Sequence, residues 1–92
     1  MKLRVEVTQE DIEEGEPRSN SNCPLARAII RCSEGVFHPS VARGYCALRP
    51  GRIDSLVIDM PDEASTFESL FDMGVYVEPF VFDLEIPEGI GV

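Results

Sequence analysis

The stretch Phe80-Val81-Phe82-Asp83-Leu84-Glu85-Ile86 alternates in polarity along its whole length. Successive side chains of a β-strand point to opposite faces of the sheet, so the phenylalanines, Leu84 and Ile86 would share one face. Val81, Asp83 and Glu85 would share the other. The stretch therefore predicts a strand with one face in the core and the other in solvent.

Further strands are expected toward the N-terminus. Residues 2–7 alternate in the same way and predict a half-buried first strand. Residues 36–38 and 44–48 have strand character and are interrupted by Pro39, and residues 53–59 predict a strand returning from a turn at 49–52. That turn has the Pro-Gly pair that a type II turn favours.

Helices are predicted between these strands. Residues 8–11 have the form of a capping box and predict a short helical turn that stops at Gly15. Cys23 and Pro24 predict the N-cap and first position of a helix that ends at Gly35. A second main helix should open at Pro61 and close at Gly74. The expected fold is one α+β domain over residues 1–92, with a mostly antiparallel sheet of about four strands and two main helices on one face.

Composition excludes several classes of function. The 92 residues carry seventeen acids and eight bases, a net charge of −9, so nucleic acid and anionic membranes would repel the protein. No apolar run is long enough for a membrane-spanning helix, and the alternating N-terminus is not typical of a signal peptide. We therefore expect no membrane partner. The small, odd number of cysteines is typical of a reducing compartment, so we expect a cytoplasmic protein.

The charge is distributed unevenly along the chain. Residues 1–16 carry two bases and six acids, and residues 17–52 carry six arginines and one acid. Residues 53–92 carry ten acids and no base. A surface built for solubility alone usually mixes the two signs, so this segment suggests a binding surface of a single sign.

The cysteines and the single histidine give weak indications of chemistry. Cys23, Cys32 and Cys46 are too few for a disulfide framework, and with His38 they match no zinc spacing. A thiol at a helix N-terminus with Arg27 one turn away could be a reactive thiolate, so a Cys23-dependent enzyme stays an alternative. The simpler interpretation is that Cys23 caps its helix and is packed, and we expect no catalytic residue, metal or cofactor.

Arg27 and Arg31 lie four residues apart and could bind a phosphate. In a protein with so many acids, we expect them instead to pair with carboxylates of the chain itself.

The carboxylates of residues 53–92 are the candidate binding site. Glu68 and Asp72 are four apart on the second main helix, where like charges destabilise the helix by about 0.2–0.5 kcal/mol. Asp83 and Glu85 share the solvent face of the last strand. Such acids, held on regular elements, could imitate a phosphate backbone and occupy the cationic groove of a nucleic-acid-binding protein. The candidate partner-binding residues are Asp62, Glu63, Glu68, Asp72, Glu78, Asp83 and Glu85.

Three blocks of sequence carry a resemblance. Residues 7–15 (Val-Thr-Gln-Glu-Asp-Ile-Glu-Glu-Gly), 23–28 (Cys-Pro-Leu-Ala-Arg-Ala) and 79–84 (Pro-Phe-Val-Phe-Asp-Leu) resemble small proteins of phages and mobile elements. In size and acidity the chain is similar to anti-CRISPR proteins, several of which act as DNA mimics on type I surveillance complexes. The resemblance carries no contact residues over to this chain.

That resemblance implies a phage-encoded, non-enzymatic inhibitor that blocks target DNA binding by a type I CRISPR surveillance complex in the bacterial cytoplasm. Val81 and exposed strand edges could support a dimer, so we expect a monomer or a weak dimer. An alternative is a phage accessory or regulatory protein whose acidity serves solubility only.

Overall fold

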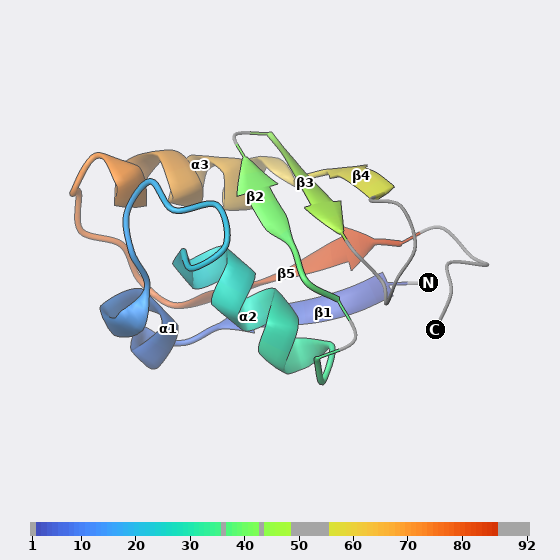
Figure 1. The fold of residues 1–92 in the computed structure, drawn as a ribbon. Helices are drawn as coiled ribbons and strands as arrows, with labels where there is room; N and C mark the ends of the chain where they lie inside the picture. The colour runs from blue at the N-terminus through green and yellow to red at the C-terminus, as the bar shows by residue number, and fades with distance from the viewer. Residues whose placement is uncertain (1, 36, 43, 49–55, 87–92) are drawn as a thin grey trace.

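The fold is α+β, as the sequence predicts. The computed structural model describes residues 2–35, 37–42, 44–48 and 56–86, and within them the chain forms three helices and five strands (Figure 1). In chain order these are β1 (Lys2–Val7), α1 (Gln9–Glu14), α2 (Pro24–Cys32), β2 (Ser40–Ala42), β3 (Tyr45–Leu48), β4 (Leu56–Asp59), α3 (Asp62–Asp72) and β5 (Phe80–Glu85). The predicted turn at 49–52 and the start of the strand at 53 lie outside the described residues.

The strands form two antiparallel sheets, so the expected single sheet of four strands was wrong in this detail. β5 pairs with β1, with Val5 opposite Phe82 and Leu3 opposite Leu84. β2, β3 and β4 form a separate three-stranded sheet in that order. The alternation predicted for β1 and β5 is confirmed, whereas β2 lies between the two predicted segments 36–38 and 44–48. Alternation within a strand does not show which strands pair.

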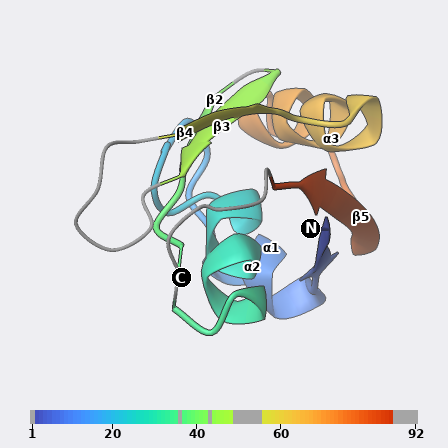
Figure 2. The same cartoon turned by 90° about the vertical axis from the view of Figure 1, so that its right-hand side faces the viewer.

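The helices do not share one face of a sheet, which corrects a second detail of the expectation. α3 and the three-stranded sheet lie on one side of the molecule, and α1, α2 and the two-stranded sheet lie on the other (Figures 1 and 2). α2 packs along β1, and the core fills the space between the two sides. α1 packs against α2 within the same layer.

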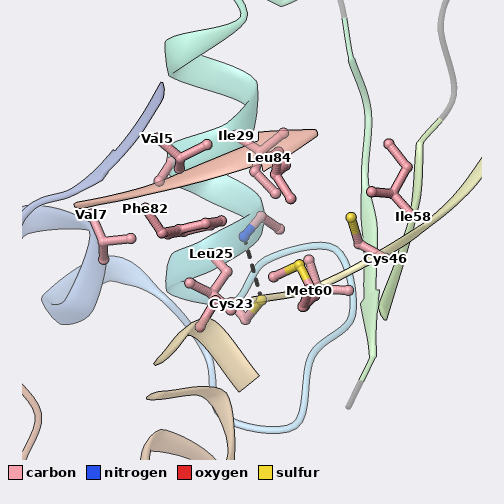
Figure 3. Packing of buried hydrophobic residues seen from close by; sticks show 14 of the residues in the cluster. Val5, Val7, Cys23, Leu25, Ile29, Cys46, Ile58, Met60, Phe82 and Leu84 are labelled. Atoms are coloured by element: carbon pink, nitrogen blue, oxygen red, sulfur yellow. Dashed lines mark hydrogen bonds between the residues drawn. The ribbon is translucent and has the colours of Figure 1, made fainter. Parts of the chain in front are cut away.

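Side chains from both layers meet in the core. Val5 of β1, Leu84 of β5, Ile29 of α2 and Cys46 of β3 are fully buried and lie around the same interior (Figure 3). Phe80 is half-buried and Phe82, Leu84 and Ile86 are buried, as the alternation predicts. Val81, Asp83 and Glu85 are exposed. The sequence therefore identified the correct inner face of β5.

The predicted helix ends are confirmed. Thr8 and Asp11 form both bonds of a capping box at α1, and the Cys23 Sγ accepts a hydrogen bond from the Ala26 N–H at the start of α2. Gly35 and Gly74 follow α2 and α3 with φ angles of 81° and 79°, a conformation that glycine adopts without steric cost.

Candidate functional site

Glu68 does not belong to an exposed row of acids, because its side chain is buried. It is only 4% exposed, on the face of α3 that also buries Ala64 and Phe67. Residues 64, 67, 68 and 71 fall on one side of a helix, so the apolar spacing itself places Glu68 toward the interior. The predicted role of Glu68 as a phosphate surrogate is therefore wrong.

Burial changes the chemistry of the Glu68 carboxyl. Loss of solvent around the charged form, together with the nearby charge of Asp72, raises the pKa of Glu68 from 4.5 to about 7. The Cys23 thiol forms a hydrogen bond with this carboxyl and partly offsets the increase in its pKa. Among the described residues, the Oε1 atom of Glu68 has no hydrogen-bond partner. Glu68 is thus a buried acid at the contact between α3 and the start of α2.

Asp72 has a structural partner within the chain. Its Oδ1 accepts a hydrogen bond of 2.7 Å from the backbone N–H of Arg18. This bond connects the last turn of α3 to the loop that precedes α2, across 54 positions of sequence. Asp72 is half-buried, so the pair Glu68 and Asp72 does not present two free anions to a partner.

Asp83 and Glu85 are exposed, but bases from the other end of the chain lie beside them. In the register of the two-stranded sheet, Arg4 is opposite Asp83 and Lys2 is opposite Glu85. Opposite charges at directly facing positions attract and partly neutralise each other. The absence of bases in residues 53–92 therefore does not produce an anionic surface on β5.

Asp62, Glu63 and Glu78 are exposed, and no described residue forms an ion pair with any of them. Asp62 and Glu63 occupy the first turn of α3, where the helix dipole favours anions. Asp59 is also exposed and precedes α3 by only three residues. Sequence reasoning did not select Asp59, although its place directly before a helix N-terminus was a signal for doing so.

A groove lies beside α3, and the sequence did not predict it. We call it the α3 groove, and its volume is about 470 Å³. It is lined by Glu63, Thr66, Phe67, Leu70, Tyr76, Val77, Glu78 and Phe80. Leu70 is 36% exposed on the wall of this groove, and Tyr76 is 79% exposed. Two of the candidate carboxylates, Glu63 and Glu78, therefore flank an apolar surface.

The Cys23 thiol is unsuited to nucleophilic chemistry. Cys23 is fully buried, and burial followed by the charge of Glu68 raises the pKa of its thiol to about 12. These effects outweigh the lowering by the N–H groups at the start of α2. The capping and packing role is confirmed, and the reactive-thiolate alternative loses its physical basis.

Alkylation of the native protein tests this assignment. At pH 7.5 we expect iodoacetamide to modify the half-buried Cys32 while Cys23 and Cys46, both buried, react only after unfolding. Mass spectrometry of peptides from native and urea-unfolded samples would locate the label, and Cys32→Ser provides the control. Rapid labelling of Cys23 in the native protein would contradict the assignment.

The two arginines of α2 pair with an acid of the chain, as expected. Arg31 donates two hydrogen bonds from Nη1 to the Asp11 carboxylate, at 3.1 and 3.0 Å, and its Nη2 donates to the Glu6 carbonyl. Arg27 Nε lies 4.0 Å from Asp11 Oδ1. Asp11 belongs to α1, so these contacts join the two helices.

Other kinds of site find little support in the described part of the chain. No group of three His, Cys, Asp or Glu side chains is placed there to hold a metal ion. No helix within these ranges has the length and apolar character needed to cross a membrane.

Comparison with known proteins gave no relative. No protein-family model matches the sequence. The comparison with curated proteins gave no match. The comparison with solved structures likewise gave none.

Proposed function

We propose that this protein is a non-enzymatic inhibitor that binds the cationic groove of a nucleic-acid-binding defence complex, in the first place a type I CRISPR surveillance complex in the bacterial cytoplasm. The observation that carries the proposal is the cluster of exposed acids at the start of α3, which form no ion pair with any described residue, together with Glu78 across the α3 groove. The part of the sequence that contains these acids, from residue 53 onward, has no lysine or arginine.

The physical argument rests on charge and rigidity. Asp62 and Glu63 are held by a regular helix, so their carboxylates are positioned before the partner arrives. A net charge of −9 would accelerate association with a basic groove and would repel nucleic acid itself. The proposed contact surface is therefore Asp62, Glu63 and Glu78, supplemented by Asp59, and it no longer includes Glu68 and Asp72.

Competition binding tests the proposal with two variants of equal charge. The protein would be titrated into a type I surveillance complex bound to labelled target DNA, at low and at raised salt. We expect displacement that weakens with salt, and an apparent affinity about tenfold weaker for Asp62→Asn/Glu63→Gln because two contact charges are lost. Asp83→Asn/Glu85→Gln also removes one aspartate and one glutamate charge, and it should compete like the unmodified protein.

Circular dichroism of both variants would show that the fold is retained. This check matters because each first-turn acid stabilises α3 by about 0.3–1 kcal/mol. Equal effects of the two variants would mean that net charge, and not the α3 surface, drives competition. An unmodified protein that displaces no DNA at either salt concentration would overturn the proposal.

A phage accessory protein whose acidity serves solubility is the second candidate. The placement of Arg4 and Lys2 opposite Asp83 and Glu85 favours it, because that surface carries mixed charge. This candidate predicts no competition with nucleic acid under any salt condition.

A further inference from the structure

The α3 groove has an apolar wall built by helical spacing. Thr66, Phe67 and Leu70 come three, four and seven positions after Glu63, which places all four along one side of α3. The opposite wall is the segment from Tyr76 to Phe80. Phe67 belongs to both sides of α3, because it is buried together with Ala64 and Glu68 and also lines the groove. Glu63, Thr66 and Leu70 are exposed and line the groove alone.

Packed aromatic rings support the floor of the groove. The ring centroid of Phe67 lies 4.8 Å from that of Phe80 and 6.3 Å from that of Phe71. Phe80 continues this contact to Phe82 in the core, with centroids 5.4 Å apart. Because both floor rings are fixed by neighbours, an occupant would find a surface formed in advance and would not have to order it.

Exposed apolar side chains occur in the segment that follows α3, and one of them, Tyr76, lines the groove. Tyr76 is 79% exposed, Met73 is 73% exposed and Val75 is 44% exposed, all within the segment that follows α3. Single exposed apolar residues are common on soluble proteins, but a group beside an apolar groove is typical of an interaction site. Tyrosine and methionine are also enriched where proteins bind one another.

The two acids at the rim of the groove determine which charge a bound molecule can carry. Glu63 stands on the helical wall and Glu78 on the opposite wall, and no lysine or arginine is found among the described lining residues. An acidic occupant would be repelled, and a purely apolar one would leave both carboxylates without partners. A cationic side chain would meet the carboxylates and could lie against the exposed Tyr76 ring.

We propose that the α3 groove binds a short segment of a partner protein in which a bulky apolar side chain is flanked by arginine or lysine. The apolar side chain covers Leu70 and Phe80, and the flanking cations pair with Glu63 and Glu78. The inference shares these two acids with the proposed function. It does not depend on that function, because the groove recognises a protein segment whether or not the partner binds nucleic acid.

A peptide titration tests the chemistry of the occupant. The probe is acetyl-Arg-Trp-Arg-amide, added to ¹⁵N-labelled protein at pH 7 and followed by amide chemical shifts. We expect saturable shifts confined to residues 63–70 and 76–80. Acetyl-Glu-Trp-Glu-amide and acetyl-Arg-Gly-Arg-amide should bind at least about tenfold more weakly, because the first reverses the charge and the second lacks the apolar anchor.

Two matched variants locate the binding site. Leu70→Lys places a cation on the groove wall and should weaken binding of the Arg-Trp-Arg peptide about tenfold. Val81→Lys likewise puts a lysine in place of an apolar residue, at a position of β5 that is 44% exposed and outside the α3 groove, so it should bind the peptide normally. The amide spectra of both variants would show whether the fold is unchanged.

Several results would overturn the inference. Equal binding of the Glu-Trp-Glu peptide would exclude charge selection, and shifts away from the groove would exclude the site. Shifts of the groove amides that grow with protein concentration alone would identify a second copy of the chain as the occupant. If the protein displaces no DNA but binds the Arg-Trp-Arg peptide normally, the proposed function is refuted and the groove assignment still holds.

Discussion

The change in the free energy of unfolding caused by Glu68→Gln is expected to be more favourable at pH 8 than at pH 5 by about 2.5 kcal/mol. The pKa of Glu68 is about 7 in the folded protein, against the ordinary value of 4.5 that applies when the chain is unfolded and the carboxyl is solvated. Between these values the folded state holds a proton that the unfolded state has released. The contribution of Glu68 to stability therefore falls as the pH rises from about 4.5 to 7, and the glutamine variant does not show this decrease.

Urea unfolding of both proteins at pH 5 and pH 8 measures the difference directly. Glu63→Gln is the matched control, since it makes the same substitution on the same helix at an exposed position. It should change stability by similar small amounts at both pH values. A constant difference between the Glu68→Gln variant and the unmodified protein across this range would show that Glu68 titrates normally.

Asp11→Ala is expected to lower the free energy of unfolding by about 2–4 kcal/mol. The Asp11 carboxylate is almost fully buried, and its Oδ2 accepts a hydrogen bond of 3.0 Å from the Thr8 backbone N–H. It also pairs with Arg31 and faces Arg27. Removing it breaks the capping box of α1 and leaves two arginines without their acid. Arg31 is half-exposed, so the expected loss of stability is near the lower end of the range that is typical when a buried ion pair is broken.

Thermal unfolding followed by circular dichroism would check this prediction, with an expected fall in Tm of about 10–20 °C. Glu14→Ala serves as the control because Glu14 is an exposed acid of the same helix. A similar Tm for the two variants would mean that the contacts of Asp11 contribute little to stability.

The local elements of the fold were predictable from short sequence patterns. The capping box at Thr8 and the proline at the first position of α2 each depend on residues a few positions apart. The alternation of residues 80–86 identified the buried face of β5 for the same reason. The division into two sheets was not predictable, because the pairing of β1 with β5 depends on residues almost a full chain length apart.

The candidate site was predictable only in part. Counting charges along the sequence correctly found the acids at the start of α3, but it could not show that Arg4 and Lys2 lie opposite Asp83 and Glu85. The burial of Glu68 was available from the sequence, since residues 64, 67 and 71 define the inner side of α3. The α3 groove depends on where the segment 76–80 passes beside α3, and no local pattern specifies that path.

The pairing of β1 with β5 has a consequence for how the chain folds. The first strand leaves the ribosome while its partner, at the other end of the sequence, is still to be synthesised. Contacts of such long sequence separation slow folding, because the intervening chain must be ordered before they form. Until residues 80–85 have been synthesised, the backbone groups of β1 lack the strand with which they pair, so the nascent chain carries an unpaired strand edge that can associate with other chains.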